Sequence, residues 1–298
     1  MKSILYIHNG YLDSEKANII QVINMCHSFS NEGIKVELIL NKSKNKLSNI
    51  DEYVKSKFGF VLNFKIKILD LKKRLFNLNK YLIDPRIKKI IKESNHQYLF
   101  LRSPLYIKLG IRFKKKIIFE SHNNILHNRF KLIDILWKNI ISRSINNKNF
   151  VLFLSISKSL NNYWKNYGLN SKKCYYYHDG FNLENFKNIK DQTFYRRELS
   201  LPLKDKIITY TGSLYQDRDI DLIINLAKEF TNYFFCVVGG PESSKLYYRN
   251  ICIKNNLKNI IFIGRVDHSK INSYLFASNV LLALWSKNVK TINYCSPL

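Results

Sequence analysis

Ser3-Ile-Leu-Tyr-Ile-His8 and Ile34-Lys-Val-Glu-Leu-Ile-Leu40 are the two segments that decide the fold. Both are apolar runs of strand length, and Asn9-Gly10 is expected to end the first of them. Between them, residues 17–31 carry apolar side chains at helical spacing, and Gly33 stands where a helix C-cap belongs. Strand, helix and strand in this order form a βαβ unit, which predicts a parallel sheet.

The same alternation of strands and helices continues along the chain. Its first half carries predicted strands at 98–101, 116–120 and 150–156, and predicted helices at 85–94, 130–146 and 158–167. Its second half carries predicted strands at 206–211, 233–238, 260–263 and 280–284, and predicted helices at 219–230, 244–255 and 268–277. Residues 41–80 are rich in Lys and Asn, and their weak patterning predicts no element.

These elements predict an α/β protein built from two Rossmann-like domains. We expect the first domain over residues 1–180, a linker over residues 181–204 and the second domain over residues 205–298. Only a short segment follows the strand predicted at 280–284. We therefore expect the second domain to be incomplete at its C-terminus.

The charge of the chain is strongly positive. Its 298 residues include 49 Lys and Arg against 22 Asp and Glu, which gives a net charge of +27. Such a field attracts nucleic acid, anionic lipid or sugar phosphates. Equally, the joint abundance of Lys, Asn, Ile, Tyr and Phe is what a biased AT-rich coding sequence produces, and this alternative stays open. Nucleic acid is not an expected partner, because no RRM, KH or zinc-finger spacing is present.

Other sequence features limit the class of protein further. The five cysteines are scattered and form no C-x-x-C pair, so neither a zinc site nor a disulfide framework is predicted. Reduced thiols in a cytoplasm are expected instead. No P-loop occurs, which argues against an ATPase or kinase. The N-terminal apolar run is too short for a signal peptide, and no apolar stretch approaches the roughly 18–20 residues that span a bilayer.

Ligands of open parallel sheets bind beyond the carboxyl ends of the strands, so the residues that follow each predicted strand are the first candidates. Gly10 follows the first strand, and Gly264-Arg265-Val266 follows the strand at 260–263. Gly212 and Ser213 follow the strand at 206–211, with Arg218 just before the next helix. A glycine turn, a helix N-terminus and an arginine suit a phosphate group. The alternative is a plain strand-to-helix turn with a solvated arginine.

His122 follows the strand at 116–120 and is a candidate for hydrogen bonding to a ligand or for acid–base chemistry. A purely structural histidine is the alternative. Glu120 is positioned either to orient His122 or to cap a neighbouring helix. His8, His127 and His178 carry the same ambiguity with weaker placement.

Residues 129–148 predict an amphipathic helix. Its apolar stripe is Phe130, Ile133, Trp137, Ile140 and Ile141, and its basic flanks are Arg129, Lys131, Lys138 and Arg143. This pattern fits a helix that lies at a membrane interface, and it also fits an ordinary core helix with a basic outer face.

Several of these segments, in this order along nearly the whole chain, resemble the family 4 (group 1) glycosyltransferases of the GT-B fold. The matching segments are residues 4–7, 17–21 and 31–36, Glu120-Ser-His122, Ser155-Ile-Ser-Lys-Ser-Leu160, residues 178–186, Tyr210-Thr-Gly-Ser213, Phe262-Ile-Gly-Arg-Val266, residues 274–282 and Ser296-Pro-Leu298. The resemblance implies two facing Rossmann-like domains with a nucleotide-sugar in the cleft. It also implies a metal-independent transferase that retains the anomeric configuration.

By position, the resemblance places Gly10 near the donor phosphates and His122 near the transferred sugar. It assigns Ser213 and Arg218, next to Gly212, to the diphosphate. Arg265 and Val266 are assigned to the base, chiefly through backbone groups. His122 and Arg218 are thus the expected catalytic residues. No metal and no cofactor are implied, because the nucleotide-sugar is a co-substrate.

The chain departs from the family pattern at three places. The family usually has Lys-Gly where this chain has Arg218-Asp219, and Asn279 replaces a family aspartate. The family's Glu-x7-Glu segment, whose glutamates contact the donor, lies beyond Leu298. We therefore expect little or no transferase activity from the chain as a truncated form.

The expected function is transfer of a sugar from a nucleotide-sugar to a surface polysaccharide, a lipopolysaccharide or a lipid-linked acceptor. The expected location is cytoplasmic, as a peripheral protein on the anionic inner face of the membrane. Two alternatives stay open. One is a nucleotide-sugar 2-epimerase of the same fold, and the other is a non-catalytic basic pseudoenzyme that binds membranes or polyanions.

Overall fold

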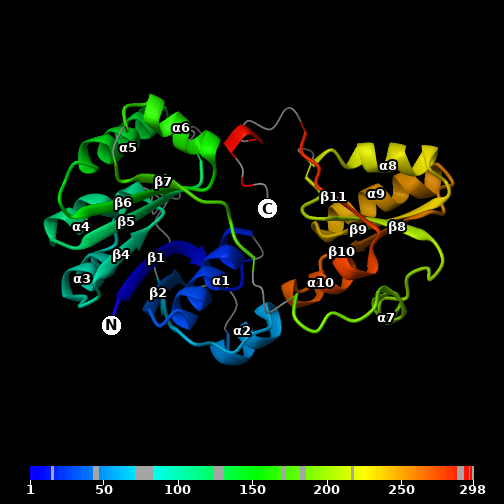
Figure 1. Ribbon diagram of the computed structural model, residues 1–298, viewed down its shortest axis with the longest axis horizontal. Coiled ribbons are helices and arrows are strands. Elements are labelled where there is room, and N and C mark those ends of the chain that lie inside the picture. Colours follow the sequence, from blue (N-terminus) through cyan, green and yellow to red (C-terminus); the bar gives the residue numbers. More distant parts are fainter. Residues whose placement is uncertain are drawn as a thin grey trace. The chain divides into compact units, whose positions relative to one another are not determined.

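The computed structural model describes residues 1–14, 17–42, 47–70, 83–123, 131–169, 172–181, 186–215, 218–286, 292–294 and 296. The chain forms two compact units, each built around a parallel sheet with packed helices (Figure 1). Unit 1 comprises Met1–Asn49, Leu62–Phe181 and Asn293–Leu298, and unit 2 comprises Ile50–Val61 and Asn182–Ile292. The predicted α/β class with two Rossmann-like sheets is confirmed.

Unit 1 contains a seven-stranded sheet. Its strands are β1 (Ser3–Tyr11), β2 (Lys35–Asn41), β3 (Lys65–Leu69), β4 (Tyr98–Leu101), β5 (Lys116–Ser121), β6 (Phe150–Ser155) and β7 (Cys174–Tyr176). Its helices are α1 (Ala17–Asn31), α3 (Pro85–Glu93), α4 (Ile107–Arg112), α5 (Lys131–Ser144) and α6 (Lys158–Asn166). The strand order is β3-β2-β1-β4-β5-β6-β7, and all neighbours are parallel. The order reverses between β1 and β4, which is where α/β sheets usually bind ligands.

Unit 2 contains a four-stranded sheet. Its strands are β8 (Lys206–Thr211), β9 (Tyr233–Val238), β10 (Ile260–Gly264) and β11 (Val280–Leu282), in the parallel order β10-β9-β8-β11. Its helices are α2 (Ile50–Phe58), α7 (Gln192–Glu198), α8 (Ile220–Glu229), α9 (Glu242–Lys254) and α10 (His268–Ala277). This order also reverses, between β8 and β11. The two neighbouring strand ends are therefore the expected ligand edge of this sheet.

Helix α2 precedes β3 in the sequence but belongs to unit 2. It lies along α10, where the Ser269 hydroxyl donates to the Ser56 carbonyl (3.3 Å) and Lys57 pairs with Asp267 (3.9 Å). Conversely, Tyr294 and Ser296 follow the last strand of unit 2 in the sequence but belong to unit 1. The chain thus passes between the units several times, whereas the sequence placed residues 50–61 in the first domain and 205–298 in the second.

Strand β1 differs from its prediction. Asn9 and Gly10 do not end it, because the strand continues to Tyr11. The pairing of β1 with β2 shifts register between Ile7 and Tyr11, which marks a bulge or irregularity. The other predicted strand ends at Gly212 and Gly239 are confirmed, since β8 ends at Thr211 and β9 at Val238.

Aromatic side chains fill much of the core of unit 1. Phe119 of β5 stacks on Phe153 of β6 with ring centroids 5.7 Å apart, and Phe153 meets the edge of Trp164 from α6. All three are buried. Helix α6 is anchored there by Ser157, whose hydroxyl accepts from the Leu160 backbone N–H as an N-cap.

The predicted apolar stripe of α5 packs on the core through Trp137, Ile140 and Ile141, but the flanks of the helix differ from their prediction. Lys138, expected on the basic flank, is buried with its ammonium 4.9 Å from the ring centroid of Tyr167. Leu132, Ile135 and Leu136 are exposed instead, Leu132 by 80%. The expected Phe130 and Arg129 lie outside the described residues. No helix among the described residues is long and apolar enough to cross a membrane.

Candidate functional site

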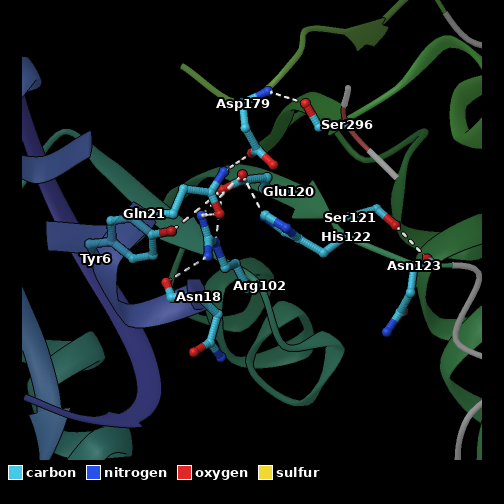
Figure 2. A network of polar contacts seen from close by, with 10 residues as sticks. All are labelled: Tyr6, Asn18, Gln21, Arg102, Glu120, Ser121, His122, Asn123, Asp179 and Ser296. Carbon is cyan, nitrogen blue, oxygen red and sulfur yellow. Dashed lines mark hydrogen bonds and ion pairs between the residues drawn. The ribbon is translucent and has the colours of Figure 1, made fainter. Parts of the chain in front are cut away.

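The buried carboxylate of Glu120 is the centre of a polar cluster in unit 1 (Figure 2). Arg102 donates to it twice, from Nε to Oε2 (3.0 Å) and from a terminal nitrogen to Oε1 (3.1 Å). His122 Nε2 lies 2.6 Å from Oε1, and the Tyr6 hydroxyl donates to Oε2 at 3.4 Å. A buried carboxylate needs such partners, because burying an unpaired charge is very unfavourable.

The topology of the sheet brings these residues together. Tyr6 lies on β1, Arg102 directly follows β4, and Glu120 lies near the end of β5. The three strands are consecutive in the sheet and parallel, so their carboxyl ends share one edge. The cluster therefore stands at the reversal between β1 and β4.

The charges of the cluster stabilise one another. Burial by itself would raise the pKa of Glu120, but the Arg102 guanidinium and hydrogen bonds from His122 and Tyr177 outweigh it and lower the pKa to about 2. Burial opposes the charge of Arg102, yet its neighbours, led by Tyr6 and Glu120, raise the pKa of Arg102 overall. Glu120 is thus an anion and Arg102 a cation at neutral pH.

The network extends from Arg102 to the last described residue. Arg102 also donates to Gln21 Oε1 of α1 (3.0 Å), and the Gln21 amide donates to the carboxylate of Asp179. The backbone N–H of Asp179 donates to the Ser296 hydroxyl (2.9 Å). Figure 2 shows this path from His122 through Glu120, Arg102, Gln21 and Asp179 to Ser296. Gln21 and Ser296 are members that no strand-end argument indicates.

Gly10, the predicted donor-binding glycine, lies beside His8. A Cβ on Gly10 would come within 2.6 Å of His8 Nε2, so only glycine fits this close approach. His8 Nε2 is buried and has no hydrogen-bond partner among the described residues. Burial, followed by electrostatic interactions with Arg102 and His122, lowers the pKa of His8 to about 4. His8 is therefore neutral at pH 7.

A second cluster lies in unit 2 at the carboxyl end of β8. Arg218 Nε donates to the Ser213 hydroxyl (3.2 Å), and the Arg218 guanidinium carbon lies 3.6 Å from the ring centroid of Trp285. Trp285 follows β11, the neighbour of β8. The Tyr210 hydroxyl donates to the Ser213 carbonyl (2.9 Å), and the Gly212 N–H donates to Val238 (2.9 Å). The structure thus groups Gly212, Ser213 and Arg218 as predicted, and adds Trp285.

Asp219 occupies the N-cap position of α8 without capping it. Its side chain makes no cap hydrogen bond, and its backbone is left-handed with φ 53°. Glycine adopts this conformation at little cost, which explains why the resembling family has Gly at this point. The aspartate therefore adds a negative charge beside Arg218 without a capping gain.

Arg265 and Val266 lie at the end of β10, which β9 separates from β8. Arg265 is exposed, and Val266 packs on the small core around Tyr274 and Ala277. Gly264 has φ 86°, and its carbonyl accepts the Gly239 N–H (2.7 Å). These residues therefore share the ligand edge of the sheet with Gly212 but are not its direct neighbours.

Three side chains meet the geometry of a metal site. Ligand atoms of Glu120, His122 and Asp179 all lie within 4.8 Å of one another, the one such group within the described part of the chain. A carboxylate has about four acceptor positions, and Glu120 already takes two donors from Arg102 and one each from His122 and Tyr6. The donor set and the adjacent guanidinium charge are a poor fit to a divalent cation.

Comparison with known proteins gives one family match. Residues 191–287 match the family model described as "Glycosyl transferases group 1". No curated protein matches the chain.

Solved structures of low sequence identity share the fold. One is Anabaena Alr3699/HepE in complex with UDP and glucose, with a TM-score of 0.66 and 11% identity over 94% of this chain and 73% of that chain. Another is sucrose-phosphate synthase from Thermosynechococcus elongatus, with a TM-score of 0.64 and 13% identity over 94% of this chain and 75% of that chain. A glycosyltransferase from Rickettsia africae has a TM-score of 0.64 and 16% identity over 94% of this chain and 72% of that chain. The two-sheet architecture is therefore that of the GT-B glycosyltransferases.

Proposed function

We propose that this protein is a glycosyltransferase that moves a sugar from a nucleotide-sugar, with retention of configuration and without a metal ion. The observation that carries the proposal is the Arg218–Ser213–Trp285 cluster, which lies at a sheet edge within residues 191–287, the segment that matches the family model. Structural neighbours that bind UDP or UDP-glucose support a nucleotide-sugar donor. The acceptor class we propose is a surface polysaccharide, a lipopolysaccharide or a lipid-linked glycan, which the likeness to the lipopolysaccharide galactosyltransferase WaaB supports.

The chemistry follows from charge. Breaking the bond between sugar and phosphate builds negative charge on the departing diphosphate. Arg218 supplies a fixed cation, and the Ser213 hydroxyl and nearby backbone N–H groups supply donors, so no metal is needed to stabilise that charge. Stacking on Trp285 holds the guanidinium in place before the donor binds, which reduces the ordering cost of binding. In unit 1, His122 is assigned to a hydroxyl of the transferred sugar.

Nucleotide binding is the first test. We expect UDP or another nucleoside diphosphate to raise the melting temperature, and Arg218→Ala to weaken binding about 10- to 100-fold. Trp285→Ala is expected to weaken binding less, because the cation remains but loses its support. Arg249→Ala, at an exposed arginine of α9, is the control and should bind as the wild type does. Equal binding by Arg218→Ala and the wild type would remove the basis of the proposal.

Product analysis separates the transferase from its rivals. Incubation with a donor alone yields an epimer only if the protein is a 2-epimerase, whereas transfer requires an acceptor. Anomeric NMR of the product reports retention, and turnover in EDTA reports metal independence. A pseudoenzyme would bind polyanions in a salt-sensitive way but show no protection by nucleotides.

We also propose that unit 1 contacts an anionic membrane through α5. Leu132, Ile135 and Leu136 are exposed at i, i+3 and i+4 spacing, which forms one apolar face on a protein of net charge +27. Replacing all three by Ser should lower binding to phosphatidylglycerol vesicles at least tenfold. Replacing the exposed Leu246 and Ile253 of α9 by Ser is the control. Unchanged binding by the α5 variant would exclude this face.

A further inference from the structure

We propose that Glu120 and Arg102 are positioning residues that hold His122 as its Nε2–H tautomer, and that Nδ1 is the His122 atom that meets the ligand. The tautomer follows from the contact between His122 and Glu120 and from the ionised state of that carboxylate beside Arg102. Only the identity of the ligand, a sugar hydroxyl of the donor, rests on the proposed function.

The first step concerns the proton between His122 and Glu120. Their contact, 2.6 Å between Nε2 and Oε1, joins two atoms that both accept hydrogen bonds unless one carries a proton. Glu120 is ionised at neutral pH, because its pKa lies at about 2. The proton must therefore reside on Nε2 of His122.

The second step concerns the other ring nitrogen. A neutral imidazole carries one proton, so with Nε2 protonated, Nδ1 presents a lone pair. No hydrogen bond to Nδ1 is found among the described residues, and the His122 side chain is 27% exposed. Nδ1 is thus able to accept a hydrogen bond from a ligand hydroxyl. The opposite tautomer would present an N–H and select a ligand acceptor instead.

The third step concerns the rigidity of Glu120. Both of its oxygens accept from Arg102, and Tyr6 donates to Oε2, so the carboxylate cannot rotate away from His122 without breaking several contacts. Arg102 is itself held by Gln21. Without Arg102 the buried carboxyl would take up a proton, and it would then donate to Nε2 and reverse the tautomer. The arginine therefore sets the direction of the hydrogen bond.

Nitrogen-15 NMR of the whole protein at about pH 8 tests the tautomer directly, because protonated and unprotonated ring nitrogens differ widely in chemical shift. His122→Asn identifies the His122 signals among the seven histidines. We expect the wild type to show Nε2–H alone. A dominant Nδ1–H form in the wild type overturns the proposal, and this measurement needs no variant to fold.

Glu120→Gln provides the second arm. An amide can donate to Nε2 as well as accept from it, so we expect a mixture of His122 tautomers in this variant. Glu93→Gln, at an exposed residue of α3, is the matched control and should leave the wild-type signals unchanged. An unmixed Nε2–H form in folded Glu120→Gln would show that Glu120 does not set the tautomer. Stoichiometric Zn²⁺, Mn²⁺ or Mg²⁺ that shifts the His122 signals would identify a metal ligand and also overturn it.

Activity separates this inference from the proposed function. Glu120→Gln should lower kcat about 10- to 100-fold and leave the dissociation constant for nucleoside diphosphate unchanged, because the diphosphate contacts are assigned to Arg218 and Ser213. Wild-type kcat in Glu120→Gln with a mixed tautomer would show that the tautomer does not serve the reaction. Absence of nucleoside diphosphate binding by the wild type, combined with an Nε2–H His122, would contradict the glycosyltransferase and leave the positioning role standing.

Discussion

Arg196 is a buried cation whose partners are backbone carbonyls and one amide. Its Nε donates to Ala277 (2.9 Å), and a terminal nitrogen donates to Asn279 Oδ1 (2.7 Å). Burial lowers the pKa of Arg196, with Asp205 opposing that effect. The same Asn279 oxygen accepts the Ile207 N–H (2.7 Å). Asn279, the residue before β11, thus joins α7 and β8 through a side chain that carries no charge.

Asn279→Asp should stabilise the protein. The substitution keeps the acceptor oxygen and turns a contact in which only Arg196 is charged into an ion pair with a buried guanidinium, for which we expect a gain of about 1 kcal/mol. Urea unfolding measures the change in the free energy of unfolding. Asn259→Asp is the matched contrast, since the Asn259 amide donates to the carbonyls of Ala227, Phe230 and Tyr233 and an aspartate would lose them. Stabilisation by both variants, or by neither, would contradict the argument.

Lowering the pH should reduce the stability of the folded state in two pH ranges, one set by His8 and a lower one set by Glu120. The folded state holds His8 neutral down to about pH 4, whereas an unfolded histidine binds a proton near pH 6.5, so stability falls as pH drops from 6.5 to 4. Glu120 is depressed to about 2 from 4.5, so its contribution is complete above pH 4.5 and is lost as pH falls towards 2.

The substitution His8→Asn should remove only the loss of stability that His8 causes between pH 6.5 and pH 4. Between pH 7 and pH 5 the wild type should lose about 2 kcal/mol more unfolding free energy than His8→Asn, from the titration of that one histidine. Guanidinium unfolding at each pH measures the difference. Parallel pH profiles for the two proteins would show that His8 is not held neutral.

The residues of the two clusters differ in how well the sequence indicates them. Glu120, His122, Ser213 and Arg218 follow from the rule that ligands meet strand ends. Arg102 and Trp285 carry the same signal, since each directly follows a predicted strand, at 98–101 and at 280–284, but neither was predicted as a site residue. Gln21 and Ser296 carry no local signal, because only the tertiary fold brings them to Asp179.

At the scale of elements, buried strands are the most predictable part of the chain. Continuous apolar runs mark β4, β8 and β9, whose bounds agree with the prediction. Strand β3 was not predicted, because it is an edge strand in which Lys65 and Lys67 alternate with two isoleucines. Helix α2 is short and buries only Val54 and Phe58, so its amphipathic pattern is weak.

The turn after β9 depends on a glycine. Gly239 has φ 121°, and a Cβ there would collide with the carbonyl oxygen of Gly212, a backbone atom that cannot swing away. Gly239→Ala should therefore cost about 3 kcal/mol or more, and should also weaken nucleotide binding by moving Gly212. Thermal and urea unfolding measure the loss.

Gly168→Ala is the control for the turn. Gly168 also has a positive φ, 101°, but nothing lies within 4 Å of an added Cβ. This variant carries only the conformational penalty, about 1–2 kcal/mol. Equal losses in the two variants would mean that the contact with Gly212 is unimportant.

At the scale of the whole molecule, the net charge of +27 is poorly compensated. Ion pairs such as Lys42–Asp70 are largely exposed and contribute little. Repulsion among the remaining cations should destabilise the folded state until salt screens it. We therefore expect the melting temperature to rise by a few degrees as KCl increases from about 0.02 to about 0.5 M.

A variant with a lower net charge tests whether repulsion among the cations causes this dependence of the melting temperature on KCl. Lys88→Glu with Lys89→Glu, both exposed on α3, lowers the net charge of +27 by four. The melting temperature of this variant should respond less to KCl than that of the wild type. An equal or larger response would show that salt acts through something other than overall repulsion.

The repeated passage of the chain between its two units has a consequence for biosynthesis. A ribosome delivers α2 early, yet its partner α10 follows only after β3 to β10 have been made. Likewise, the hydrogen bonds of Asp179 with Ser296 and of Ser157 with Tyr294 can form only after most of unit 2 has been translated. Unit 1 cannot reach its final state until residues 294–296 have been made, and α2 lacks its partner until α10 has been made, so both units expose unfinished surfaces to chaperones and proteases during synthesis.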